Sequence, residues 1–358
     1  MRDKMQFGKN KQRKMWKTHM IFLGTCAVLA LSGCGNKEAK ETYKQAVVYL
    51  EEGDFVSAET AFQAVADAEV RLPEAYRGLG IAQLNMGKYA EASIALSKSL
   101  YYMEDENAEF EQDVMSYLAI SRTRRMEYDE AIELYTELIQ MDENEEYYFL
   151  RGKCYIETEN YDKAKADFDM AASMSRDYNL FLNIYEIYNN LQMNADASAY
   201  LEQALELVSD RDHYSRGLIH YYLQDYTKAK EDLIQAINEE QNAKAMLLLG
   251  KVYLSLDDAT NARTMYMEYV DNPEVAAEAY NGLALCDIAE SNYQSALENI
   301  QKGLECEGEE VRQSLLFNEI CVYEYMKDWD KAREKVNQYV QLYPTDEAGL
   351  REKAFLIH

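Results

Sequence analysis

The chain has 358 residues, with 37 lysines and arginines against 64 aspartates and glutamates, and a net charge of −27. Such an acidic protein repels nucleic-acid phosphates and anionic lipid headgroups, which excludes functions that need a basic surface; we interpret the excess acid as a solvated surface. With only three prolines, the chain is expected to be almost wholly helical. Its length predicts two or more globular domains, unless it is a repeat rod in which each unit contacts only its neighbours.

The first 33 residues have the pattern of a secretion signal. Seven basic residues precede an apolar run over 20–31 that is too short to span a bilayer as a stable helix. The run ends in Leu31-Ser32-Gly33-Cys34, which resembles the lipobox of bacterial lipoproteins. The resemblance implies that the Cys34 thiol carries a diacylglyceryl lipid and that a signal peptidase cleaves before it. An ordinary signal with an incidental cysteine is the alternative.

Residues 34–38 would then form a short tether between the lipid and the first helical pattern. The resemblance therefore places the protein at the cell membrane, lipid-anchored on the extracytoplasmic face. The membrane is the cytoplasmic one, or an outer membrane where one exists.

From residue 39 onward one spacing recurs. An alanine is followed four residues later by an apolar or aromatic residue, and these alanines are Ala58, Ala92, Ala131, Ala164, Ala197, Ala229, Ala262, Ala296 and Ala332. Three residues before the alanine, an aromatic residue stands in seven of the nine places: Phe55, Tyr89, Tyr128, Tyr161, Tyr226, Tyr293 and Trp329. Twelve residues before it, a small residue stands in seven: Ala46, Gly80, Ala119, Gly152, Gly217, Gly250 and Ala284.

This pattern resembles the tetratricopeptide repeat, a unit of about 34 residues that forms a helix, a turn and a second helix. The resemblance implies an all-α, right-handed superhelical solenoid of about nine antiparallel helix pairs over residues 39–344. The small residues let paired helices approach closely, and the aromatic residue fills the wedge after the turn.

Some units depart from the pattern. The fifth has Tyr185 at the small position and Asn194 at the turn, and the seventh has Ala259 at the turn, so local irregularity is expected there. The acidic residues 104–106 are expected in a longer loop. After Pro344, residues 345–358 are expected to form a helix that caps the end of the rod.

No enzyme, metal or cofactor motif is found, so we expect no catalysis, no cofactor, no metal and no small-molecule substrate. His213 and His220 lie seven residues apart, which is roughly 10 Å along a helix, so one metal ion cannot bridge them directly. We interpret both histidines as structural. The later cysteines show no disulfide framework, although a Cys306–Cys321 bridge stays possible.

By repeat phase, several polar and aromatic side chains face the groove lined by the first helices. They are Arg77, Asn85, Arg124, Lys153, Asn189, Asn190, Tyr214, Tyr221, Tyr222, Lys251, Asn281 and Tyr325. Aromatic rings give contact area at a small entropy cost, and Asn amides bond to peptide backbones. The three tyrosines Tyr214, Tyr221 and Tyr222, flanked by Asn189 and Asn190, are the first candidates for a contact patch. A merely solvated groove wall is the alternative.

The leading hypothesis is a membrane-anchored scaffold or adaptor that binds a protein or peptide partner in its groove. It rests on the resemblance, since a fold does not fix a function. Two alternatives stay open. One is an envelope-assembly lipoprotein of the kind that helps to build outer-membrane barrels or type IV pili. The other is a wall-associated protein with an unrecognised activity.

Overall fold

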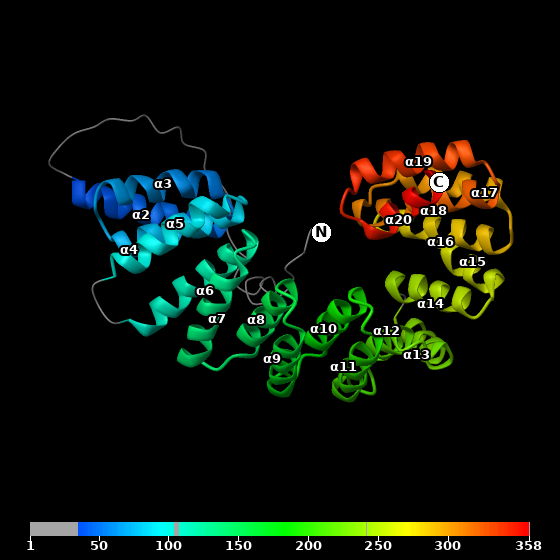
Figure 1. The fold of residues 1–358 in the computed structure, drawn as a ribbon, viewed down its shortest axis with the longest axis horizontal. Helices are drawn as coiled ribbons and strands as arrows, with labels where there is room; N and C mark the ends of the chain where they lie inside the picture. The colour runs from blue at the N-terminus through cyan, green and yellow to red at the C-terminus, as the bar shows by residue number, and fades with distance from the viewer. Residues whose placement is uncertain (1–34, 104–106, 241, 358) are drawn as a thin grey trace. The chain divides into compact units, whose positions relative to one another are not determined.

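The computed structural model describes residues 35–103, 107–240 and 242–357. All nineteen elements in these ranges are α-helices (Figure 1), which confirms the predicted all-α class. In this part of the chain no helix has both the length and the apolar character needed to cross a membrane. The predicted signal peptide, the lipobox with Cys34 and the acidic residues 104–106 lie outside the described residues.

The helices form two compact units that adjoin in sequence at Arg176 and Asp177. The N-terminal unit contains four helix pairs. Their bounds are α2 (Gly35–Glu52), α3 (Phe55–Asp67), α4 (Leu72–Asn85), α5 (Tyr89–Tyr101), α6 (Ala108–Arg124), α7 (Tyr128–Met141), α8 (Glu145–Glu157) and α9 (Tyr161–Met174). Helix α2 begins inside the predicted tether, because the sequence from Lys37 onward favours helix and Glu38 lies in the first turn, where it complements the helix dipole.

The C-terminal unit contains five helix pairs and a last single helix. Their bounds are α10 (Tyr178–Asn190), α11 (Asn194–Leu207), α12 (His213–Tyr222), α13 (Tyr226–Glu239), α14 (Ala243–Ser255), α15 (Ala259–Met267), α16 (Ala276–Ala289), α17 (Tyr293–Glu305), α18 (Glu309–Tyr325), α19 (Trp329–Leu342) and α20 (Glu347–Ile357). Helix α20 lies where the capping helix is predicted, and it packs on α19.

The repeat positions have the packing roles that the sequence predicts. All nine repeat alanines lie on second helices and are at most 1% exposed. The seven turn aromatics each begin a second helix. In the C-terminal unit, a Cβ atom added at Gly250 or Gly282 would lie 2.6 or 2.4 Å from the ring of Tyr266. The absence of side chains at these glycines therefore lets the ring of α15 lie between α14 and α16.

The turn within each pair is also regular. Two residues before each second helix, one residue has a positive φ; these are Gly53, Gly87, Met126, Glu159, Gln192, Gln224, Asp257, Ser291 and Lys327. Seven of the nine are not glycine, so the packing of the two helices, and not glycine, imposes the left-handed conformation. The fifth and seventh units keep this turn despite Asn194 and Ala259.

The first helices of successive pairs contact one another. In the N-terminal unit α4 contacts both α2 and α6, and in the C-terminal unit α14 contacts α12 and α16, which in turn contacts α18. The first helices thus line one side of each stack. We call this side the inner face.

The four cysteines among the described residues are free thiols, so the possible Cys306–Cys321 bridge is not formed. Cys154 and Cys286 are buried, and burial raises the pKa of these thiols to about 11 and about 12. Cys321 is half-buried, and burial raises its pKa to about 11. Cys306 follows the last residue of α17, and its thiol donates a hydrogen bond to the carbonyl of Lys302 at 3.3 Å.

Candidate functional site: the inner face of α10 and α12

Helices α10 and α12 are the first helices of consecutive pairs in the C-terminal unit. They are joined by a hydroxyl pair, with Tyr178 Oη 2.8 Å from Ser215 Oγ. Ser215 is only 3% exposed. Its backbone N–H donates a 3.0 Å hydrogen bond to the carboxylate of Asp212, the residue that caps α12. The beginning of α12 is therefore fixed both by its own cap and by α10.

Four tyrosine rings form a continuous chain across these helices and the start of α13. The ring centroids of Tyr185 and Tyr222 are 5.1 Å apart, those of Tyr222 and Tyr221 are 5.7 Å apart, and those of Tyr221 and Tyr226 are 6.0 Å apart. Such separations are typical of aromatic rings in contact. All four side chains are half-buried, so each keeps part of its surface open to solvent. We call Tyr185, Tyr221, Tyr222 and Tyr226 the tyrosine cluster.

The hydroxyl groups of the cluster are available as donors. Burial raises the pKa of Tyr222 to about 12 and also raises the pKa of Tyr185 and Tyr221 above the ordinary value. These phenols therefore stay protonated at neutral pH. Within the described ranges, none of the four hydroxyls makes a hydrogen bond to the protein.

The other predicted groove residues of this unit lie on α10, on α12 or on later helices. Asn189 and Asn190 are exposed in the last turn of α10, and Lys251 is exposed on α14. Tyr214 is half-buried and lies close enough to Tyr222 to contribute to the raised pKa of that residue.

Two predicted residues have partners of their own. Asn281 on α16 accepts a 2.8 Å hydrogen bond from Asn318 on α18. Tyr325 stacks on Tyr293, with centroids 5.7 Å apart and ring planes 14° apart. The structure thus brings the rings of Tyr221 and Tyr222 into contact, and it engages Asn281 and Tyr325 in separate contacts.

The predicted basic residues Arg77, Arg124 and Lys153 belong to the N-terminal unit. Arg77 on α4 forms an ion pair with Asp113 on α6 and lies over the ring of Tyr117 at 5.7 Å. Its guanidinium is therefore already neutralised by this chain.

The other predicted polar residues of the N-terminal unit lie on α4, α6 and α8. Arg124 is half-buried at the end of α6, and Lys153 Nζ lies 5.8 Å from the ring of Phe149. Asn85, at the end of α4, donates to the carbonyl of Ile81 at 2.8 Å.

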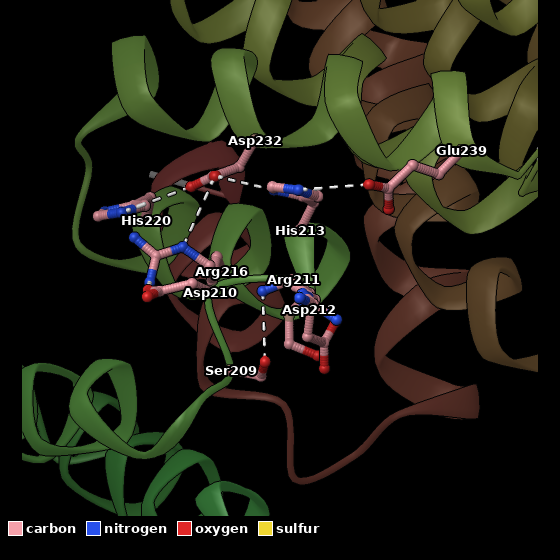
Figure 2. A network of polar contacts seen from close by, with 10 residues as sticks. Ser209, Asp210, Arg211, Asp212, His213, Arg216, His220, Asp232 and Glu239 are labelled. Carbon is pink, nitrogen blue, oxygen red and sulfur yellow. Dashed lines mark hydrogen bonds and ion pairs between the residues drawn. The ribbon is translucent and has the colours of Figure 1, made fainter.

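A polar network holds the other side of α12 against α13 (Figure 2). Asp232 of α13 has one carboxylate oxygen 3.6 Å from His213 Nδ1 and 3.7 Å from Arg216 Nε, and the other 3.6 Å from His220 Nε2. All three separations are longer than hydrogen bonds, and the two histidine contacts are ion pairs only while the imidazoles are protonated. Glu239 lies 3.4 Å from His213 Nε2. Asp232 thus draws three side chains of α12 toward α13.

The two histidines act as packing residues in this network. The side chain of His220 is 5% exposed, and burial lowers its pKa from the ordinary 6.5 although Asp232 opposes the shift. In the described ranges, no group of three or more His, Cys, Asp or Glu side chains has a geometry that could hold a metal ion.

The sequence interpretation does not identify Tyr185 and Tyr226 as site residues. In the sequence, Tyr185 is noted only because it occupies a position where the repeat usually has a small residue. Tyr226 is noted only as the aromatic residue after a turn. In the next pair the same small position holds Gly217, where an added Cβ would lie 2.7 Å from Leu233. A tyrosine ring does not fit into so narrow a space. A tyrosine at this position of the repeat was therefore the sequence signal that the Tyr185 side chain does not pack between the two helices of its pair.

Comparisons with known proteins support the repeat assignment. Residues 43–103 and 214–273 match one model of the tetratricopeptide repeat, and residues 145–178 match another. Similar curated proteins include the BBSome complex member BBS4 homolog of Drosophila melanogaster, 20% identical over 266 residues, and anaphase-promoting complex subunit 3 of Schizosaccharomyces pombe, 24% identical over 227 residues. The matches cover 73% and 61% of this chain but only 49% and 33% of those relatives.

Among solved structures, yeast Tom70 is similar in fold, with a TM-score of 0.51 and 15% identity over 90% of this chain and 82% of that one. At this identity the likeness concerns the fold alone. Together with the helix pairs and the family matches, it establishes that the chain contains tetratricopeptide repeats and has an all-α solenoid fold.

Proposed function

We propose that this protein is a lipid-anchored, extracytoplasmic scaffold that binds an extended peptide segment of a protein partner on the inner face of α10 and α12. The observation that carries the proposal is the tyrosine cluster, whose contiguous rings are half-exposed and whose hydroxyls are free to donate. Tyrosine gives a large contact area at a small cost in side-chain entropy, which is why it is common in binding surfaces.

The supports of the cluster favour this role. The Tyr178–Ser215 hydroxyl pair fixes α12 relative to α10, and Asp232 draws α12 onto α13. Helix-borne rings held in this way lose little freedom when a ligand arrives. Preorganisation of this kind raises affinity without adding contacts.

The membrane anchor is supported by the signal-like first 33 residues and the lipobox at Cys34. A Cys34→Ser variant should lose incorporation of a palmitate analogue and move from the detergent phase to the aqueous phase in a phase-partition assay. Cys306→Ser is the matched control and should keep both properties. Equal lipid labelling of the Cys34→Ser and unaltered proteins would contradict the anchor.

Site-specific photo-crosslinking in living cells tests the groove. A crosslinker at Tyr221 should give a discrete adduct with one partner, and an added Tyr222→Ala change should weaken that adduct. Lys40, exposed on α2, and Tyr325, 56% exposed on α18, serve as controls and should not capture the same partner. No adduct above background from Tyr221, or the same adduct from all three positions, would overturn the proposal.

A further inference from the structure

The N-terminal unit has a cavity of its own, lined by residues of the three successive first helices α2, α4 and α6. Its volume is about 380 Å³, which is within the range of small ligand pockets. We propose that this cavity binds a basic side chain, arginine or lysine, of a protein partner. The cavity and the tyrosine cluster belong to different units, so the inference does not depend on the function proposed for that cluster.

The walls of the cavity combine carboxylates with aromatic rings. Helix α2 contributes a ring, α4 contributes a carboxylate and a guanidinium, and α6 contributes two carboxylates and a ring. These residues are Tyr43, Glu74, Arg77, Glu109, Phe110 and Asp113. A carboxylate pairs with a cation and a ring attracts it, while the aliphatic stem of arginine or lysine packs on apolar surface. Such walls therefore suit a basic side chain.

The charges around the cavity are only partly balanced within the chain. Glu74 accepts hydrogen bonds from Arg71 through Oε1 alone. Asp113 is paired with Arg77 through Oδ2 alone. The second oxygen of each carboxylate has no partner among the described residues. Glu109 is exposed and forms no ion pair within the same ranges. Three carboxylates against two guanidinium groups leave one net negative charge at the cavity, with carboxylate oxygens free to accept.

The chain's own arginines show that positive charge is stabilised here. The Arg71 guanidinium lies 4.4 Å from the ring centre of Tyr43 and donates to Glu74 at 3.1 and 2.8 Å. Burial opposes the charged form of Arg77, yet the pKa of Arg77 is raised because Asp113 stabilises the guanidinium. An acidic ligand would meet the three carboxylates instead. The net charge of −27 adds a long-range attraction for cations.

Fluorescence anisotropy with the full chain in an uncharged detergent tests the inference. The probe is a short labelled glycine–serine peptide with one central arginine. Its comparison peptide has citrulline in that place, which keeps the shape of arginine and lacks the charge. The arginine peptide should bind at least about fivefold more tightly. Glu109→Gln should weaken its binding by about threefold, whereas Glu111→Gln should change it by less than about 1.5-fold. Glu111 is the matched control, because it lies on the same helix outside the cavity.

Equal binding of the arginine and citrulline peptides would overturn the inference. Equal losses in Glu109→Gln and Glu111→Gln would do so too, because they would indicate a general attraction to an acidic chain. Glu74→Gln removes a second wall carboxylate and leaves Arg71 without its partner, so it should weaken binding at least as much as Glu109→Gln. Tyr221→Ala should leave binding unchanged. If it weakens the arginine peptide, that peptide binds at the tyrosine cluster, and the inference fails while the proposed function stands.

Discussion

The hydroxyl oxygen of Tyr178, in the first turn of α10, lies 2.8 Å from Ser215 Oγ in α12. Because Ser215 is nearly fully buried and is also bound to the cap residue Asp212, this contact ties two successive inner helices at one end. Tyr185 and Tyr222, which meet further along the same two helices, inherit their relative position from it.

Replacing Tyr178 by Phe removes this hydroxyl and keeps the ring. We expect the free energy of unfolding of the C-terminal unit to fall by about 1 kcal/mol, the usual net value of one such hydrogen bond. Urea unfolding measures the loss, and hydrogen exchange should show faster opening in α10 and α12. Tyr253→Phe in α14 is the control, because its hydroxyl makes no hydrogen bond in the described ranges. Equal losses in the two variants would argue against a specific tie.

Asp232 is the acidic centre of the contact between α12 and α13. Asp232→Asn should destabilise the unit by roughly 2 kcal/mol, between the values typical of exposed and buried ion pairs. It should also lower the pKa of His220 further, because the carboxylate raises that pKa against the effect of burial. An NMR titration of His220 measures this shift. Glu231→Gln, on the exposed side of α13, should leave the His220 titration unchanged.

The C-terminal helix carries a pH-dependent contact. Burial, together with the neighbouring Glu352 of α20, raises the pKa of Glu324 on α18 from 4.5 to about 7. The folded state therefore holds this proton more tightly than the unfolded chain does. The resulting stability is complete below about pH 4.5 and is lost as the pH rises through about 7.

Thermal unfolding of Glu352→Gln, compared with the unaltered protein between about pH 5 and pH 8, checks this contact. The variant should lose less stability as the pH rises. Glu347→Gln is the control on the same helix, since that side chain is 83% exposed. A stability difference between Glu352→Gln and the unaltered protein that does not change with pH would show that the carboxyl pair is not linked to folding.

Tyr266 offers a test of packing without hydrogen bonding. Its hydroxyl is buried and has no hydrogen-bond partner in the described structure. Tyr266→Phe should therefore be neutral or stabilise the unit by up to about 1 kcal/mol. Gly282→Ala, which places a Cβ 2.4 Å from the same ring, should instead cost about 1–3 kcal/mol. Urea unfolding measures the change in the free energy of unfolding for both variants. A clear decrease for Tyr266→Phe would mean that the Tyr266 hydroxyl does make a hydrogen bond in the folded protein.

The sequence predicts the helix pairs well because their determinants are local. Ala58 and Ala332 are both fully buried on second helices. Their burial follows from their place in a short spacing that recurs in every unit. The pairing of Arg77 with Asp113, or of Tyr178 with Ser215, was not predictable. These partners lie 36 and 37 residues apart, and their contact depends on how one helix pair packs against the next. In the sequence, Tyr185 likewise differs from the repeat pattern only by its size at a position that is usually small. The position within the repeat does not predict which neighbours so large a ring contacts.

The free thiols have a consequence for labelling chemistry. Thiolate is the reactive form of cysteine, and the raised pKa values of Cys154, Cys286 and Cys321 leave almost none of it at neutral pH. These three side chains should therefore resist oxidation and alkylation. Cys306 lies outside the helices, so a maleimide fluorophore should attach there first among the described cysteines. Within residues 35–357, Cys306 thus offers a selective position for a spectroscopic reporter beside α17 without any engineered cysteine.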